Sequence, residues 1–257
     1  MSTDFSILEH VETVEGCPKD YHILAKYHYQ REIHVPFTKI YKLVGKNEYD
    51  GCWPDPLSVI CYMQPVPDCH TRNIATGGYF KQFRSTSDRL TLLNKTVLYI
   101  SRLITDPRFL RRGLGSKLLK DSLSLIDVPM VETMTPIDFT NKIYVRAGFE
   151  IFYMPSPIKH KRLVAAFLKT GIVLSETTAP ELIDARLAHL SKPMSDYIEN
   201  EIRLFLSGYR NADRFGPTHK RTKFILSKVP PPEVYLLWLS PTHPAAQKIL
   251  DYKIKTR

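Results

Sequence analysis

The chain has 257 residues, of which 43% are hydrophobic and 24% are charged, and its formal net charge is +10 at pH 7. This length and hydrophobic content suffice to bury a core in one large domain or two smaller ones, which excludes a disordered chain. No apolar run approaches the roughly 18 to 20 residues that span a bilayer, and the first stretch, MSTDFSILEHVETVEG, lacks the regions of a signal peptide, so we expect a cytoplasmic protein without a membrane partner.

The first hundred residues alternate between helical and strand patterns. Apolar side chains at helical spacing predict a short helix over 17–28, and two β-rich stretches at 39–45 and 56–65 predict a hairpin around a connector with Gly and Pro. Residues 66–94 contain many turn-forming residues and are expected to be loop-rich. The run TVLYISRLIT at 96–105 is typical of a central strand.

A second group of elements follows this central strand. The stretch 115–126 places leucines on one stripe of a helix, and 128–134 has the pattern of a strand. Residues 138–149 predict a short helix that ends at Gly148 as its C-cap, and a last strand begins at Phe149.

The pattern changes after Pro155. Three helical patterns follow, at 159–172, 179–190 and 195–209, and the apolar run YLLWL near the end suits a strand or a buried plug. We therefore expect two parts, 1–155 and 156–257, of which the second is basic and mainly helical.

The positive charge is unevenly distributed along the sequence. Residues 1–150 hold 19 Lys and Arg against 17 Asp and Glu, whereas residues 151–257 hold 17 against 9. Such an excess can attract the phosphates of a nucleic acid or a cofactor, and it can equally be a solvated basic face. The basic side chains that would bind DNA or RNA are Lys159, Lys161, Arg162, Arg214, Lys220, Arg221 and Lys223.

The four cysteines do not form a metal or disulfide pattern. There is no CxxC pair and no dense framework, so we expect reduced thiols and no metal site. The neighbours Cys69 and His70 admit a metal interpretation, but an ordinary loop is the simpler one.

The stretch TDPRFLRRGLGSKLL at 105–119 joins the central strand to a helix through two glycines. A strand that ends in a glycine turn and starts a helix presents unpaired N–H groups at the positive end of the helix dipole, which favours anions. The string is neither GxxxxGK[ST] nor GxGxxG, because Lys117 follows Gly115 by two and Leu118 stands where a third glycine is required. A tight bend without a ligand is the alternative.

At these residues the sequence resembles the GCN5-related N-acetyltransferase superfamily, whose acyl-CoA turn reads approximately [QR]-x-x-G-x-[GA] after a strand. Leu110 departs from this pattern, and the neighbouring arginines can supply the missing charge. The resemblance implies a mixed α/β fold with a mostly antiparallel sheet flanked by helices, and acetyl-CoA or another acyl-CoA as donor. It assigns the pantetheine arm to the backbone of Leu103, Ile104 and Thr105, and the diphosphate to Arg111, Arg112, Gly113, Leu114, Gly115 and Ser116.

A second match lies downstream, where YVRAGFEIF resembles the family's Tyr-x-x-x-Gly-Phe segment. The resemblance implies that Tyr144 protonates the departing thiolate, whereas a core aromatic is the alternative. Ile137 stands where the family often has Asn. On the predicted strand 128–134, Glu132 is a candidate base or water-orienting residue, and a surface carboxylate is the alternative.

The triplet Tyr27-His28-Tyr29, together with Arg102, resembles the phage-type branch of the superfamily that includes the DNA-adenine modification protein Mom. This resemblance makes His28 and Arg102 site candidates. A charged residue inside an apolar strand must also find a carboxylate, a phosphate or solvent. The alternatives are a structural ion pair for Arg102 and a core histidine for His28.

Two functions follow from the sequence. The first is an acyl-CoA-dependent N-acyltransferase of an unidentified amine. The second is a Mom-like base-modifying or nucleic-acid-binding protein whose basic second part binds phosphates. The two coincide if the acceptor is a nucleobase, which would have to leave a duplex to react.

Overall fold

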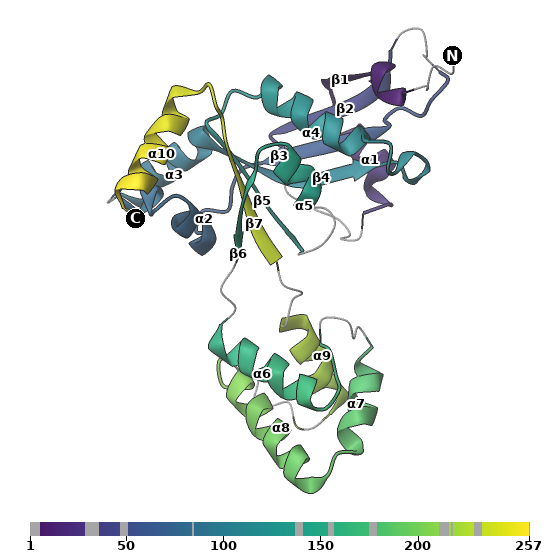
Figure 1. The fold of residues 1–257 in the computed structure, drawn as a ribbon, viewed down its shortest axis with the longest axis vertical. Coiled ribbons are helices and arrows are strands. Elements are labelled where there is room, and N and C mark those ends of the chain that lie inside the picture. Colours follow the sequence, from purple (N-terminus) through teal and green to yellow (C-terminus); the bar gives the residue numbers. More distant parts are fainter. Residues whose placement is uncertain are drawn as a thin grey trace. The chain divides into compact units, whose positions relative to one another are not determined.

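The structure is a computed structural model that describes residues 6–28, 36–46, 51–83, 85–136, 141–153, 157–174, 179–210, 216, 218–228 and 233–256. The chain divides into two compact units (Figure 1). The first comprises Met1–Phe152 together with Val234–Arg257, and the second is Tyr153–Glu233. No helix within the described ranges is long and apolar enough to cross a membrane.

The division differs from the expected parts 1–155 and 156–257. The first boundary falls near the expected position, but the last segment of the chain returns to the first unit. The physical reason is burial, because Val234, Leu236 and Ile249 are core residues of the first unit. The helical unit is therefore inserted between two neighbouring strands of one sheet.

The first unit is built on one mixed sheet. Over the described residues it has seven strands in the order β1-β2-β3-β4-β5-β7-β6. Strands β1 to β4 pair antiparallel, whereas β4 and β5 pair parallel. The strands are β1 (Val11–Glu15), β2 (Lys39–Gly45), β3 (Ser58–Met63), β4 (Val97–Thr105), β5 (Met130–Pro136), β6 (Glu150–Tyr153) and β7 (Glu233–Leu239).

One face of this sheet is covered by α4 (Leu114–Leu125) and α5 (Asn141–Arg146). The apolar stripe of α4, which includes Leu118, Leu119 and Leu123, is buried against the sheet. Its contacts on the sheet include Leu43 and Ile60, and they come from alternate strand positions because successive side chains of a strand point to opposite faces. The short helix α5 packs on α4, and Gly148 ends this segment with a φ of 93°.

The opposite face carries the remaining helices of the unit. Tyr21 and Leu24 of α1 pack on Ile40, Val59 and the neighbouring strand positions. At the other end of the sheet, side chains of α2, α3 and α10 share a cluster with Val97 and Tyr235. These helices are α1 (Pro18–Ala25), α2 (His70–Ala75), α3 (Thr86–Thr96) and α10 (Pro244–Lys255), with short 3-10 turns at Ile7–Glu9, Tyr79–Lys81 and Pro107–Phe109.

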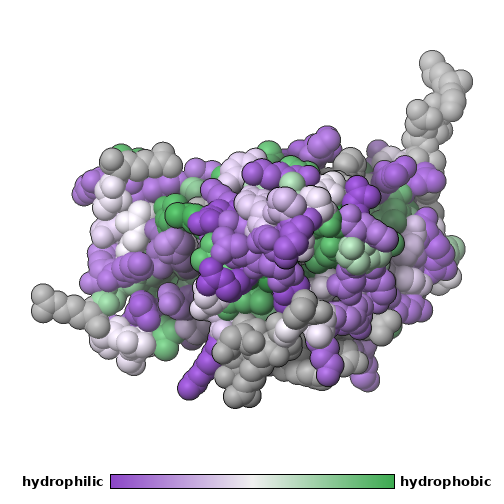
Figure 2. Space-filling view, turned by 90° about the horizontal axis from the view of Figure 1, so that it is seen from below, coloured by the Kyte–Doolittle hydropathy of each residue, from purple (hydrophilic) through white to green (hydrophobic). Residues whose placement is uncertain are grey.

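The second unit is helical and has its own core. Leu163, Phe167, Ile202 and Phe205 lie at its centre and are almost fully buried. Its helices are α6 (Ile158–Lys169), α7 (Pro180–Ala188), α8 (Lys192–Leu206) and α9 (His219–Lys228). Figure 2 shows one face of the whole chain, on which hydrophilic side chains dominate and hydrophobic ones form small separate groups.

The expected fold class is confirmed, and most expected elements are present within a few residues. The expectation of a loop-rich stretch at 66–94 was wrong, because this stretch contains α2 and α3. Helix α3 starts at the N-cap Ser85, whose side chain accepts a hydrogen bond from the Asp88 amide. The sequence interpretation also omitted β1, α9 and α10.

Candidate functional site: a turn of unpaired amides at the end of a diverging strand

The loop between β4 and α4 contains two residues with positive φ values. Arg111 and Gly113 adopt left-handed conformations, with φ values of 63° and 83°. Gly113 is the N-cap of α4 and makes no side-chain capping bond. Glycine adopts this conformation without a steric penalty, whereas for arginine it costs free energy.

These conformations leave a group of backbone amides without an acceptor among the described residues. The first N–H of the helix with a backbone partner is that of Lys117, which donates to the Gly113 carbonyl at 2.9 Å. Among the residues that the structure describes, the six preceding amides have no hydrogen-bond acceptor; they belong to Arg111, Arg112, Gly113, Leu114, Gly115 and Ser116. Unpaired N–H groups at the positive end of a helix dipole can bind an anion.

Gly115 brings this turn close to the strand that precedes it. A Cβ at this position would lie 3.2 Å from the Thr105 hydroxyl oxygen and 4.0 Å from a methyl group of Leu103. The Thr105 hydroxyl is in turn 3.0 Å from that of Ser58. The lack of a side chain at Gly115 therefore allows the first turn of α4 to lie against the end of β4.

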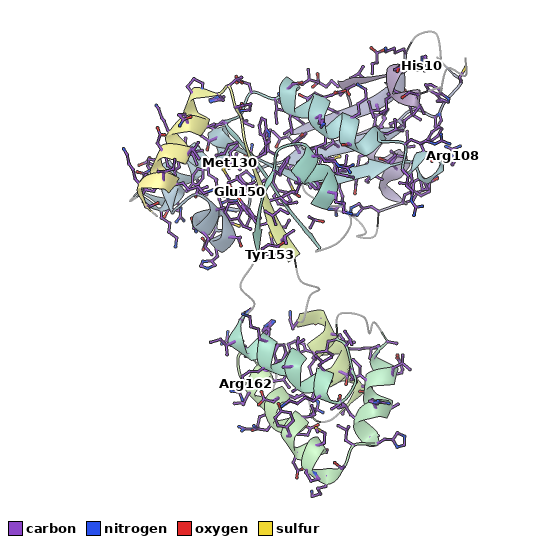
Figure 3. All side chains as sticks on the ribbon, viewed as in Figure 1. His10, Arg108, Met130, Glu150, Tyr153 and Arg162 are labelled. Atoms are coloured by element: carbon purple, nitrogen blue, oxygen red, sulfur yellow. The ribbon has the colours of Figure 1, made fainter. Side chains whose placement is uncertain are left out.

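The charges around the turn favour a negatively charged ligand. The first turn of α4 contains no acidic residue, and Arg111 and Arg112 are exposed. The nearby carboxylate of Asp106 is neutralised by Arg108, which donates to it at 3.0 and 2.7 Å (Figure 3 labels Arg108). The hydrogen bond from Arg108 lowers the pKa of Asp106, so this carboxylate stays ionised and paired. Leu110, which departs from the family pattern, is 57% exposed.

Strand β4 leaves its parallel neighbour before it reaches the turn. The pairing with β5 covers Val97 to Tyr99, and it ends at Tyr99 opposite Glu132, whereas β4 continues to Thr105 (Figure 1). At this end of the pairing, the Thr133 hydroxyl donates to the Ile100 carbonyl at 2.9 Å. The last six residues of β4 thus have no partner on β5 in the register of the described residues.

A bulge lies at the start of this part of β4. The register between β3 and β4 shifts between Cys61 and Tyr62, so that Ser101 has no Cα partner on β3. The Ser101 hydroxyl donates to the Cys61 carbonyl at 3.0 Å. Bulges bend a strand and redirect its side chains, and they often occur next to active sites.

Tyr144 lies on α5 and is part of the core on the α4 face. Its side chain is 7% exposed and packs edge-to-face against Phe149, with ring centroids 5.3 Å apart. Burial raises the pKa of the nearby Tyr62, and its hydrogen bond to Ser122 opposes this shift. The electrostatic interaction between the phenols of Tyr62 and Tyr144 raises the pKa of Tyr62 further. Tyr144 is therefore held rigidly, with most of its surface in apolar contacts.

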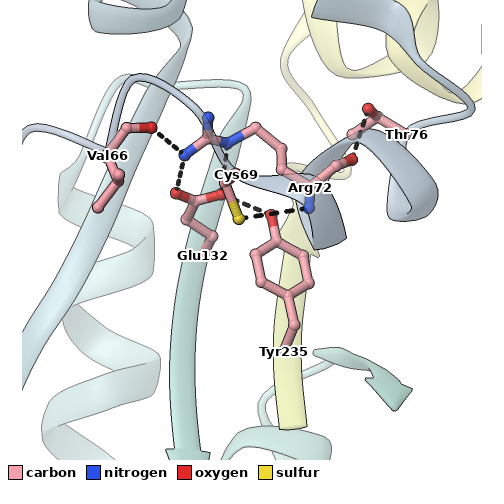
Figure 4. Close-up of polar contacts among 6 residues, drawn as sticks. All are labelled: Val66, Cys69, Arg72, Thr76, Glu132 and Tyr235. Carbon is pink, nitrogen blue, oxygen red and sulfur yellow. Dashed lines mark hydrogen bonds and ion pairs between the residues drawn. The ribbon is translucent and has the colours of Figure 1, made fainter. Parts of the chain in front are cut away.

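Glu132 is part of a buried ionic network (Figure 4). Arg72 of α2 donates to both carboxylate oxygens, at 2.7 and 2.5 Å, and Tyr235 of β7 donates its hydroxyl at 2.5 Å. Arg72 also donates to the Val66 carbonyl. Glu132 is 1% exposed. The Glu132 carboxylate is thus occupied by three donors and closed to solvent, an arrangement that favours a structural role over the expected role as a base.

The network shifts the pKa values of its members in directions that keep it intact. Burial disfavours a charged Arg72, but the hydrogen bonds to Glu132 outweigh it and raise the pKa of the guanidinium. Burial, followed by the neighbouring Glu132, raises the pKa of Tyr235 well above its usual value. Sequence inspection missed Arg72 and Tyr235, which are 60 and 103 positions away from Glu132.

Arg102 and His28 lie on the side of the sheet that α1 covers. Arg102 is opposite Cys61 in the register of β3 and β4, and Cys61 is buried with Leu24 of α1. His28 directly follows α1, is half-buried, and donates its amide N–H to the Ala25 carbonyl at 3.0 Å. Tyr29, the third residue of the triplet, lies outside the described residues, as does Ile137.

The basic residues of the helical unit are less available than the sequence suggested. Arg162 and Arg221 each form a two-pronged ion pair, with Glu201 and Glu199 respectively (Arg162 is labelled in Figure 3). Lys159 lies over the ring of Tyr209. Of the expected phosphate contacts, Lys161, Lys220 and Lys223 are exposed, and Arg214 lies outside the described residues.

Cys69 has a local structural role. Its sulfur accepts a hydrogen bond from the Arg72 amide at 3.5 Å and caps the N-terminus of α2. His70 is the first residue of that helix. Within the described ranges, no three His, Cys, Asp or Glu side chains are grouped so that they could hold a metal ion.

Comparison with known proteins gives structural likeness only. No protein-family model and no curated protein sequence matches the chain. The ribosomal-protein-S18-alanine N-acetyltransferase from Escherichia coli is 10% identical over 57% of this chain and 85% of its own, with a TM-score of 0.36. NAA60 of Arabidopsis thaliana, solved with acetyl-CoA, is 14% identical over 56% and 90%, with a TM-score of 0.39. The NatC complex bound to Gag peptide and CoA is 11% identical over 58% and 89%, with a TM-score of 0.35. Similarity at this level does not assign an activity.

Proposed function

We propose that the chain is an acyl-CoA-dependent N-acyltransferase of the GCN5-related type, with acetyl-CoA as the donor and an amine as the acceptor. The observation that carries this proposal is the group of six unpaired amides at Arg111–Ser116, directly after a strand that has left its parallel neighbour. A diphosphate provides the oxygens that these donors lack, and the free edge of β4 provides a surface for an extended ligand.

Each part of the site supplies a separate contribution. Bound acetyl-CoA would supply an acyl group activated as a thioester. The amides of the turn would hold its diphosphate, with Arg111 and Arg112 adding charge at the surface. The backbone of Leu103, Ile104 and Thr105 would pair with the pantetheine arm as a neighbouring strand does, which fixes the position of the thioester along β4.

Tyr144 is the proposed proton donor to the departing thiolate. A phenol with a pKa of about 10 can transfer a proton to a thiolate across a short hydrogen bond. Its rigid packing against Phe149 supports a positioned donor. For removal of the amine proton, His28 remains the candidate, because Glu132 is fully engaged with Arg72 and Tyr235.

The alternative, a Mom-like base-modifying or nucleic-acid-binding protein, draws its support from the resemblance around His28 and from the exposed lysines of the helical unit. Exposed lysines can bind phosphates in a salt-dependent manner. However, the two ion pairs of Arg162 and Arg221 neutralise charges on which this alternative depended. Acyl transfer from CoA is therefore the better-supported function.

The test compares two glycines that have the same backbone conformation. Gly113 and Gly78 both have a φ of 83°, and a Cβ on Gly78 would meet nothing within 4 Å. Gly113→Ala and Gly78→Ala should therefore each lose about 1 kcal/mol of stability from the backbone alone, and a Cβ on Gly113 would also lie 3.3 Å from the Leu8 side chain. Only Gly113→Ala distorts the turn, so we expect isothermal titration to show an acetyl-CoA affinity at least about ten-fold lower for this variant alone.

Acetyl-CoA should also raise the melting temperature of the wild-type protein and of Gly78→Ala. If acetyl-CoA fails to bind the wild-type protein, or if both variants lose the same affinity, the turn does not hold the donor.

A further inference from the structure

Arg102 is a buried cation for which the described residues supply no counter-charge. Only 7% of the surface of this residue is exposed, and its Nη1 donates to the carbonyl of the neighbouring Ser101 at 2.6 Å. Its Nε is inaccessible and has no hydrogen-bond partner. No carboxylate among the described residues lies within 4.0 Å of its guanidinium. Such a charge is costly to bury, and this cost is offset when an anion binds.

The ionisable group opposite Arg102 in the sheet register is not negatively charged at neutral pH. Cys61 lies directly opposite Arg102 on β3. Burial raises the pKa of this thiol to about 12, and the opposing effect of Arg102 does not bring it back into the neutral range. The thiol is therefore protonated at pH 7 and cannot neutralise the guanidinium.

The register of the sheet places Arg102 on a defined face. Residues that are directly opposite in an antiparallel pair point to the same side, so Arg102 shares the face of Cys61. Cys61 is buried with Tyr21 and Leu24 of α1, whereas α4 and its turn of free amides pack on the other face. Arg102 thus points away from the side on which α4 lies.

Arg102 also lies in the part of β4 that no longer pairs with β5. The last paired residue is Tyr99, and the proposed pantetheine contacts begin at Leu103. A thioester held along this edge would lie next to position 102. An amine that reaches the thioester from the α1 side would therefore pass the guanidinium, an inference that depends on the proposed function.

We propose that Arg102 binds an anionic group, a carboxylate or a phosphate, carried by the acceptor amine. The planar guanidinium offers parallel N–H donors that match two oxygens of either group. Because only 7% of the residue is accessible, the anion must enter a confined site rather than lie along an open surface. The acceptor class is then a small amine with a negative charge near its amino group.

The direct test follows the Arg102 Nε–H signal by ¹⁵N NMR in the full chain, assigned by its absence in Arg102→Met. Titration with sodium phosphate and with sodium acetate, each against sodium chloride at equal ionic strength, separates the two anion sources. We expect a saturable shift of this signal with one or both oxyanions and none with chloride. No shift, or the same shift with chloride, overturns the proposal.

A stability measurement separates ligand binding from a structural role. Arg102→Met removes an uncompensated charge and keeps the volume of the side chain, so its melting temperature without ligand should be equal to or higher than that of the wild-type protein. Oxyanions should raise the melting temperature of the wild-type protein, and that of Arg102→Lys to a smaller extent. They should not raise the melting temperature of Arg102→Met. A fall of more than about 4 °C in Arg102→Met would show that Arg102 is part of the folded framework.

Both titrations are run with and without saturating acetyl-CoA. If acetyl-CoA does not bind while Arg102 still responds to oxyanions, the acyltransferase proposal fails and the anion site stands. If acetyl-CoA binds and Arg102 is silent, the anion site fails and the acyltransferase proposal stands.

Discussion

Two buried arginines of the first unit differ in the number of partners that they have. Arg72 is 2% exposed and donates to both oxygens of Glu132 and to the Val66 carbonyl. Arg102 is nearly as buried, but the only acceptor it reaches among the described residues is the carbonyl of its neighbour Ser101. The network of Arg72, Glu132 and Tyr235 joins α2, β5 and β7, whereas the Arg102 side chain has no hydrogen bond or ion pair to another element among the described residues.

This difference separates polar groups that hold the fold from polar groups that await a ligand. The backbone shows the same contrast, because the amides at Arg111–Ser116 lack acceptors while the strands and helices around them are paired. Buried or converging donors without acceptors are rare in folded proteins, and they call for a ligand as their explanation.

The largest effect is expected at Arg72. Arg72→Met leaves the carboxylate of Glu132 buried without its cation, which should cost about 3 to 5 kcal/mol in the free energy of unfolding, measured with urea. Adding Glu132→Gln removes that charge and keeps an acceptor for Tyr235, so the double variant should recover a large part of the loss. If Arg72→Met unfolds at the same urea concentration as the wild-type protein, the network does not stabilise the fold.

A smaller effect of opposite sign is expected at Arg111, whose φ of 63° is unfavourable for a side chain. Arg111→Gly relieves this strain and should raise the free energy of unfolding by up to about 1 kcal/mol. The same variant should weaken acetyl-CoA binding several-fold, because it removes a charge beside the diphosphate.

Arg112→Gly is the matched control, since Arg112 does not have a positive φ. It should also weaken binding but should not gain stability. Equal changes in stability for the two variants would argue against strain at Arg111.

The smallest effect concerns Asp106, whose pKa is lowered by its hydrogen bond to Arg108. A carboxyl group with a lowered pKa in the folded state stabilises the protein above its unfolded value of 3.8, and this stability disappears as the pH falls through the folded value. Asp106→Asn should therefore lower the melting temperature modestly between pH 5 and 8. The difference from the wild-type protein should shrink below about pH 4, and a constant difference would exclude the ion pair as its cause.

The turn and its surroundings could be predicted from sequence because their signals are local. Gly113 and Gly115 follow a strand and precede an amphipathic helix, and the structure places them at a left-handed N-cap and at a close approach to Thr105. The charge of Arg102 inside an apolar strand was equally visible. The sequence could not show whether Arg102 has a partner, because that depends on which side chains other elements bring to the same face of the sheet.

The rest of the site depends on contacts between distant residues. Glu132 is next to Arg72 and Tyr235 only after α2 and β7 have packed on the sheet, so its burial could not be inferred from its strand. The return of β7 and α10 to the first unit is also non-local. Helix α9 was missed for a different reason, since its charged residues mask a narrow apolar stripe that includes Ile225.

The most direct test of the central claim is hydrogen–deuterium exchange of the backbone amides with and without acetyl-CoA. Because the six amides at Arg111–Ser116 have no acceptor among the described residues, those of the exposed Arg111, Arg112 and Gly113 should exchange quickly in the free chain. Acetyl-CoA should slow their exchange, together with that of the free edge of β4 at residues 103–105. Slow exchange in the free protein, or protection by acetyl-CoA at other segments only, would contradict the account.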